Sequence, residues 1–195
     1  SSVVIFTRFA KIVLFAFGAL LISQTPAHAL INVDGSRNQL FVFGSVTFGY
    51  DSNIFSDATD RGGYVASGAV GLELKRRAGV IAVNTTATLS YSDYGRFSDQ
   101  NSFDPSFRLE LNKTSGRTTG AFTVSAYRES RADSFVNLRT NSWNFPVGLS
   151  IKYPVNDKYY FTSQTGYLRR RYVESATLAN YLDYTQAFDI FYVYT

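Results

Sequence analysis

Cysteine and methionine are absent from the 195-residue sequence, and histidine and tryptophan occur once each. Without cysteine the chain can form no disulfide, no thiolate nucleophile and no cysteine-ligated metal site. Long apolar runs are also lacking, because the run from Ile12 to Ile22 covers only 11 residues, whereas a membrane-spanning helix needs about 20. The sequence therefore argues against disulfide-stapled proteins, thiol enzymes and helical membrane proteins.

Aromatic residues, by contrast, are abundant. The 17 Phe and 14 Tyr residues contribute most of the 16% aromatic content, while charged residues make up only 17%. A disordered chain carries far less apolar surface, so we expect this chain to fold. Because the first residue is Ser1 rather than Met, and the last residue, Thr195, is not aromatic, we also expect the sequence to be clipped at its start and truncated at its end.

The first 29 residues have the three parts of a secretory signal peptide. Arg8 and Lys11 form the basic region, the apolar run follows, and Ala27-His28-Ala29 supplies a small-x-small cleavage site. We therefore expect a signal peptide over residues 1–29 and a mature domain over residues 30–195. Cleavage would lower the formal net charge from +4 to +2 and would remove the only histidine. At that charge no nucleic-acid partner is expected.

From residue 40 onward, apolar residues recur with a period of two, which indicates strands with one apolar and one polar face. Eight segments follow the pattern, and most have 10 to 13 residues: 41–50, 65–76, 80–91, 103–113, 118–128, 141–153, 158–168 and 181–194. Soluble strands are mostly about 5 to 6 residues long, whereas a tilted strand needs about 9 to 11 to cross a bilayer. The segment lengths therefore favour membrane-spanning strands.

The connections between these segments alternate in length. The expected long connections are 51–64, 92–102, 129–140 and 169–180, and the expected short ones are 77–79, 114–117 and 154–157. Outer-membrane barrels pair tight periplasmic turns with long extracellular loops. We therefore predict an all-β fold, an antiparallel up-and-down transmembrane β-barrel, with about eight strands in this chain that form either a whole barrel or part of a larger one.

A soluble β-sandwich is the alternative, because its strands alternate in the same way. Aromatic residues near the segment ends favour the barrel, where they form interfacial girdles: Tyr50, Tyr91, Tyr94, Tyr127, Trp143, Tyr153, Tyr159, Tyr167, Tyr184, Tyr192 and Tyr194. An open sheet has unpaired edges that are costly in hydrocarbon, so we expect the sheet to close. Eight strands would make a barrel filled by its own side chains, whereas a channel needs about 16.

Polar residues on the expected inner faces carry both signs of charge. We expect them to line a lumen or to form an internal ion-pair network: Glu73, Lys75, Asn84, Arg108, Glu110, Asn112, Arg128, Lys152, Asp183 and Asp189. Arg169, Arg170 and Arg171 stand at the outer end of the seventh segment, where guanidinium groups can pair with lipopolysaccharide phosphates or reach ordinary headgroups. Outer-membrane lipid and lipopolysaccharide are therefore expected partners.

At the end of the first segment the chain reads Gly49-Tyr50-Asp51-Ser52-Asn53-Ile54-Phe55. This motif, following a signal peptide and one strand, resembles the start of outer-membrane β-barrel porins encoded with exopolysaccharide or capsule operons. The resemblance implies a Gram-negative outer-membrane location, a longer barrel of which this chain is the N-terminal part, and passage or secretion of polysaccharide or small solutes. Tyr50, Asp51, Asn53 and Phe55 form the motif turn, in which Asp51 and Asn53 can bond their own backbone.

A calcium site built from Asp51, Asn53, Asp57 and Asp60 is disfavoured, since the spacing matches no known calcium loop, and we expect no metal and no cofactor. Enzymes built on outer-membrane barrels resemble one another in using a His base, which the mature chain lacks, so catalysis is not expected. We expect a porin-like barrel that passes polysaccharide or small solutes. The alternative is a complete eight-stranded barrel that does not conduct and has a structural or adhesin role through its extracellular loops.

Overall fold

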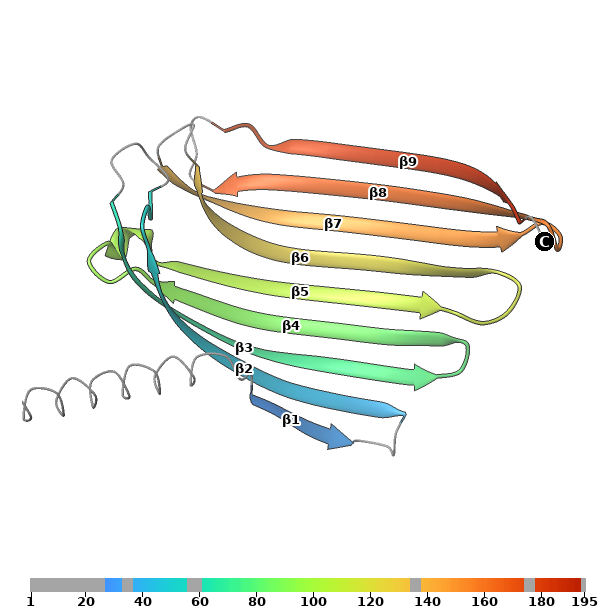
Figure 1. The fold of residues 1–195 in the computed structure, drawn as a ribbon, viewed down its shortest axis with the longest axis horizontal. Helices are drawn as coiled ribbons and strands as arrows, with labels where there is room; N and C mark the ends of the chain where they lie inside the picture. The colour runs from blue at the N-terminus through green and yellow to red at the C-terminus, as the bar shows by residue number, and fades with distance from the viewer. Residues whose placement is uncertain (1–26, 33–36, 56–60, 134–137, 174–177, 194–195) are drawn as a thin grey trace, which may run out of the picture.

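The computed structural model describes residues 27–32, 37–55, 61–133, 138–173 and 178–193. They form one antiparallel sheet of nine strands, each hydrogen-bonded to its neighbour in sequence (Figure 1). The strands are β1 Ala27–Asn32, β2 Asn38–Asp51, β3 Gly63–Ala78, β4 Ile81–Asp93, β5 Ser102–Lys113, β6 Thr119–Asp133, β7 Leu138–Pro154, β8 Tyr159–Val173 and β9 Tyr181–Tyr192. The prediction of an all-β, up-and-down antiparallel fold is confirmed.

All eight predicted segments are strands, β2 to β9, and β1 is an additional strand that the sequence pattern did not indicate. β1 begins at the expected cleavage site, and residues 1–26 of the expected signal peptide lie outside the described residues. Cleavage after Ala29 would leave only Leu30–Asn32 of β1. The signal peptide remains a prediction.

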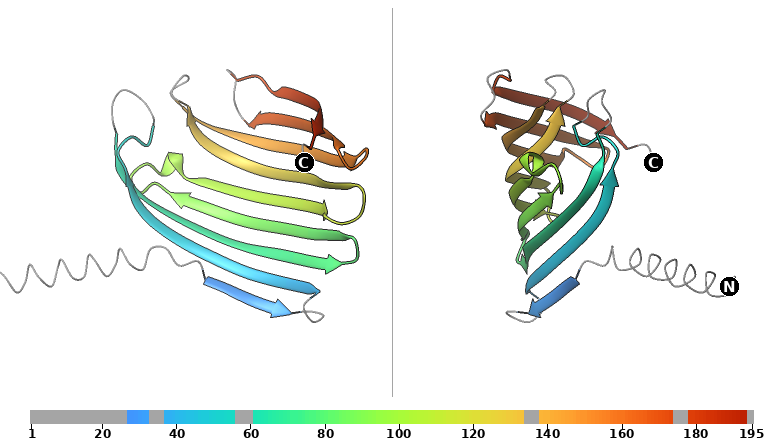
Figure 2. Two further views of the ribbon diagram at one scale, coloured as in Figure 1. Left: turned by 45° about the vertical axis from the view of Figure 1, so that its right-hand side comes forward. Right: turned by 90° about the vertical axis from the view of Figure 1, so that its left-hand side faces the viewer.

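The sheet is curved into a trough and does not close, so β1 and β9 form its two free edges (Figure 2). In an up-and-down sheet of nine strands the first and last run in the same direction, so β1 and β9 could pair with each other only in parallel. The expectation of a closed sheet is therefore not met within these residues.

At one end of the trough the connections are tight, as predicted. Gly79 and Gly116 adopt positive φ angles of 75° and 86° in the β3–β4 and β5–β6 turns, a conformation that glycine adopts without steric cost. In the β7–β8 turn, Asn156 Oδ1 accepts hydrogen bonds from the backbone of Lys158 and Tyr159, both at 2.9 Å. We call this the short-turn end, and the opposite one the long-connection end.

One expected long connection is wrong. The apolar pattern predicts a loop over residues 129–140, but β6 and β7 remain paired as far as Asp133 and Leu138. Backbone pairing does not require apolar side chains, so the ladder continues where the apolar alternation has faded. The other three long connections are 52–62, 94–101 and 174–180, and the second contains a short 3₁₀ turn, η1 Ser98–Gln100. No helix in the described ranges is long and apolar enough to cross a membrane.

The sheet is a single layer without a hydrophobic core. Ile54 is the only buried hydrophobic residue among those described, whereas Val46, Phe48, Val70 and Ile190 are 57%, 70%, 60% and 76% exposed. A β-sandwich would pack such residues against a second sheet, so the sandwich alternative is wrong for this structure. Directly paired residues share a face, which divides the sheet into a convex apolar face and a concave polar face.

Candidate functional site

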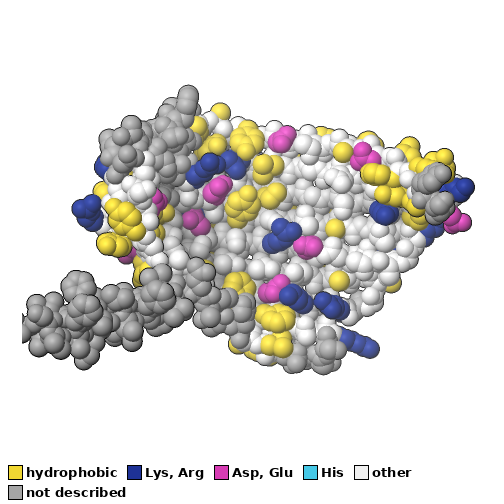
Figure 3. All heavy atoms as spheres, in the orientation of Figure 1, with side chains coloured by type: hydrophobic (Ala, Val, Ile, Leu, Met, Phe, Trp, Pro, Cys, Tyr) yellow, Lys and Arg dark blue, Asp and Glu magenta, His cyan; other side chains and the backbone are white. Residues whose placement is uncertain are grey.

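The concave polar face carries most of the predicted site residues. Figure 3 looks onto this face, where acidic and basic side chains lie next to each other on a largely polar surface. The strand register places nine of the ten predicted lumen residues here. The exception is Arg128, described below.

Six of the nine form a polar band across β3, β4 and β5: Glu73, Lys75, Asn84, Arg108, Glu110 and Asn112. Glu73 pairs with Lys75 at 3.1 Å, and Glu110 pairs with Arg108 at 3.1 Å. The two asparagine amides each donate from Nδ2 to one of these carboxylates, at 3.1 and 2.5 Å. The band is therefore an internally compensated ion-pair network, the arrangement that partly buried charges normally adopt.

The other three lie apart from this band, on β7 and β9. Lys152 holds its Nζ 4.0 Å from the ring centroid of Tyr160, a cation–π contact. Asp189 accepts a hydrogen bond of 3.5 Å from Thr162. Asp183 lies opposite Leu168 on the same face. The nine residues thus share a surface without converging on one point.

Arg128 lies on the apolar face, not the polar one. It pairs with Trp143 and donates to the backbone oxygen of Phe103 at 3.0 Å. Arg128 lies an even number of residues from Phe122 and Val124 in the same strand. The alternation from those two residues therefore places it on the apolar face. The prediction that Arg128 faces the lumen is therefore wrong.

The structure divides the three adjacent arginines. Arg169 and Arg171 pair with Phe145 and Trp143 on the apolar face, whereas Arg170 pairs with Asn144 on the polar face. Arg170 is therefore directed away from the side on which its two neighbours project.

A partly buried cluster around Arg170 was not predicted. Asn144 has no exposed surface; its Oδ1 accepts from Arg170 Nε at 2.5 Å, and its Nδ2 donates to Ser142 Oγ at 3.2 Å. Glu129 Oε2 lies 3.5 Å from the Arg170 guanidinium and completes the group. Glu129 continues the polar phase of β6, so the alternation could have placed it on the polar face. The prediction of a loop over 129–140 left it out of the strand.

The motif turn ties together two connections at the long-connection end. Asp51 Oδ1 accepts from the backbone N–H of Asn53 at 2.9 Å, which forms a local Asx turn. Ile54, 1% exposed, follows, and the ring of Phe55 meets that of Phe97 edge-on, with centroids 5.1 Å apart. The motif therefore packs the β2–β3 connection against the β4–β5 connection.

The apolar face is bordered by paired aromatic rings at both ends. Tyr50 and Tyr64 contact edge-on near the long-connection end, with centroids 5.4 Å apart. Tyr159 and Tyr192 lie near the short-turn end, 5.0 Å apart. Cross-strand pairing places each pair on this face, so apolar side chains occupy the middle of the surface and tyrosines its margins.

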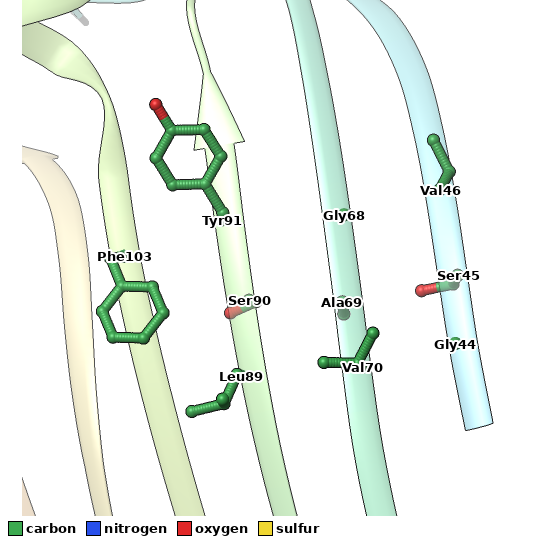
Figure 4. Close-up of a pocket in the computed structure, with 10 residues that line it drawn as sticks. All are labelled: Gly44, Ser45, Val46, Gly68, Ala69, Val70, Leu89, Ser90, Tyr91 and Phe103. Carbon is green, nitrogen blue, oxygen red and sulfur yellow. The ribbon is translucent and has the colours of Figure 1, made fainter. Parts of the chain in front are cut away.

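A shallow hollow of about 810 Å³ lies on the apolar face over β2 to β5 (Figure 4). Its floor includes Gly44 and Gly68, which have no side chains, and its walls include Val70, Leu89 and Phe103. The hollow contains few groups able to bind a polar ligand, so its shape suits an apolar chain.

No group of three or more His, Cys, Asp or Glu residues in the described ranges could hold a metal ion. Asp57 and Asp60 of the disfavoured calcium site lie outside those ranges. Comparisons with protein-family models, curated proteins and solved structures each found no match. The argument for function therefore depends on the geometry of the two faces.

Proposed function

We propose that this chain forms part of the wall of a porin-like β-barrel in the bacterial outer membrane, and that the barrel passes polysaccharide or small solutes. The observation that carries the proposal is the single-layer sheet with no apolar core and an exposed apolar convex face. In water such a face would be an aggregation site, whereas lipid tails would cover it at no cost. The polysaccharide part of the proposal comes from the resemblance of the motif turn.

The order of side chains along the apolar face of β3 supports this proposal. It runs from Tyr64 through Ala66, Gly68, Val70, Leu72 and Leu74 to Arg76. A tyrosine at one end and an arginine at the other suit the two membrane–water interfaces, with apolar residues between them. Acyl chains of the surrounding lipid would fill the hollow over Gly44 and Gly68.

A barrel in hydrocarbon needs every backbone group paired, yet β9 is the last strand of the open sheet and, within the described residues, pairs only with β8. We propose that further strands pair with this edge, which makes the concave polar face the wall of a wet lumen. A wide barrel of about 16 strands would leave an aqueous channel.

The complete eight-stranded barrel is the second candidate. Cleavage after Ala29 would leave β2 to β9 and only Leu30–Asn32 of β1. β2 and β9 run in opposite directions, so most of the free edge of β2 could pair antiparallel with β9. Such a barrel would be filled by its own side chains, and its long connections would act at the cell surface.

Two measurements on membrane-extracted full-length protein test these proposals. A folded barrel should migrate differently on a denaturing gel before and after boiling, and a soluble, non-shifting product would refute the membrane proposal. In planar bilayers we expect discrete conductance steps. A heat-modifiable protein that never conducts would exclude the pore and favour the eight-stranded candidate.

Lipopolysaccharide contact is proposed for Arg169 and Arg171, which project from the apolar face at the long-connection end, where lipid phosphates would lie. Replacing both with Gln should lower the amount of lipopolysaccharide that co-purifies with the protein. Arg131→Gln is the control, because Arg131 is at the same end in the polar phase of β6. Equal lipid content in all variants would reject the contact.

A further inference from the structure

We propose that the short-turn end of the trough attracts anionic solutes, meaning solutes that carry carboxylate, sulfate or phosphate groups. This inference rests on the proposed passage function and adds a substrate class to it. The feature that carries it is a basic rim of seven cations: Arg37, Arg76, Arg77, Lys113, Arg117, Lys152 and Lys158. In the described residues 37–39, 76–81, 112–119, 152–159 and 192–193, which form this end, Asp157 is the one acidic residue.

Among the described residues, no rim cation forms an ion pair with a carboxylate. The ion pairs found within the described ranges join Lys75 to Glu73, Arg108 to Glu110 and Arg170 to Glu129, so none of them involves a rim cation. Deeper on the concave face, positive charges are therefore neutralised by carboxylates, whereas at the rim they are not. Figure 3 shows dark-blue side chains gathered along the right-hand, short-turn margin.

Two rim cations belong to the concave face itself. Arg77 pairs with Ala82, and Lys152 pairs with Thr162, both in the polar phase. The backbone N–H of Arg77 donates to the carbonyl of Arg37 at 2.8 Å, which holds two cations side by side. Aromatic rings also support rim cations: the Arg117 guanidinium lies 5.2 Å from the Tyr153 ring centroid, and Lys152 lies over Tyr160.

The opposite end has a weaker bias, because its described residues combine eight arginines with five carboxylates: Asp51, Asp93, Asp99, Glu129 and Asp133. Asp93 and Asp99 lie close in sequence to Arg96, and Glu129 pairs with Arg170. An uncompensated charge of one sign at the mouth of a cleft raises the local concentration of oppositely charged solutes. With the short turns facing the periplasm, as proposed, the rim would draw anions from the periplasm toward the concave face.

The test compares full-length wild type with R77Q/K152Q and with the matched control R96Q/R131Q, which removes two cations from the long-connection end. In planar bilayers under a KCl gradient near 0.1 M, we expect wild type to prefer Cl⁻. R77Q/K152Q should lower the Cl⁻-to-K⁺ permeability ratio about threefold, and the effect should fade at 1 M salt, where the Debye length is about 3 Å. The control should keep the wild-type ratio.

Binding of labelled poly-L-glutamate to the folded protein in detergent is a second readout that needs no pore. We expect R77Q/K152Q to weaken this binding about threefold at low salt, with the control unchanged. Binding without conductance would refute passage and retain the anion site. Conductance with a K⁺ preference, or equal poly-L-glutamate binding in all three proteins, would overturn the inference. A loss of co-purified anionic lipid with both anion readouts unchanged would also overturn it and assign the rim to lipid headgroups.

Discussion

Val70→Arg is the sharpest test of whether lipid covers the apolar face. Val70 is 60% exposed at the middle of β3, and six positions separate it from Tyr64 in one direction and from Arg76 in the other. At a rise of about 3.3 Å per residue and a tilt of about 40°, each distance corresponds to a depth of about 15 Å. Val70 would therefore lie near the midplane of a hydrocarbon layer about 30 Å thick.

The expected cost follows from that depth. An arginine at the midplane of a barrel's lipid face destabilises it by about 2–4 kcal/mol, but near the interface by only about 0–1 kcal/mol. We therefore expect Val70→Arg to cost about 3 kcal/mol, and Tyr64→Arg about 1 kcal/mol or less. If the face were in water, both substitutions would be surface changes worth within about 0.5 kcal/mol.

The assay is the free energy of unfolding in urea of protein folded into lipid vesicles. Ser45→Arg is the matched control, because Ser45 is exposed on the polar face of neighbouring β2, opposite Ala69. It should unfold close to wild type. If Val70→Arg costs no more than Tyr64→Arg and Ser45→Arg, the apolar face is not in hydrocarbon and the membrane argument fails.

Two further substitutions test packing on the concave face, in the same unfolding assay. Asn144→Ala removes the buried acceptor of the Arg170 guanidinium and should cost about 2 kcal/mol. Asn84→Ala loses only the hydrogen bond from Nδ2 to Glu73, because its Oδ1 has no hydrogen-bond partner in the described structure. It should cost clearly less, and equal costs would refute the role of the cluster around Arg170. Gly71→Ala would drive a Cβ into the ring of Phe43 and should cost about 1–2 kcal/mol. The control is Gly49→Ala, which has open space around the added Cβ and should be near neutral. If the Gly71→Ala protein is as stable as the Gly49→Ala protein, the Phe43 ring moves aside freely.

Both candidate functions require the exposed edge of β9 to pair with another strand. Natural edge strands are usually protected by charged side chains, prolines or bulges. β9, Tyr181–Tyr192, contains no lysine or proline, and its charged residues are Asp183 and Asp189. An edge strand of twelve residues with only two charged side chains is suited to pairing with another strand. Whether that strand is β2 of the same chain or a further one decides between a filled barrel and a channel, and the conductance measurement distinguishes them.

The sequence alone was sufficient to predict eight of the nine strands, and the face of every predicted lumen residue except Arg128. Side chains alternate across a strand because of local backbone geometry, so the phase could be read without knowing any partner. Turn positions such as Gly79 and Gly116 were also predictable, since their conformations depend on the residues themselves. Where the apolar alternation faded, as over residues 129–140, the strand ends were misjudged because pairing, not side-chain character, maintains the ladder.

Only the tertiary structure decided which residues meet. Alternation tells the face of a residue but not its neighbour on the next strand, because register depends on long-range pairing. For that reason Glu129, Asn144 and Arg170, from three strands, could not be grouped from the sequence, and the paired rings of Phe55 and Phe97 were equally hidden. The uncompensated rim has the same origin: its cations are scattered along the chain, and the up-and-down topology gathers them at one end.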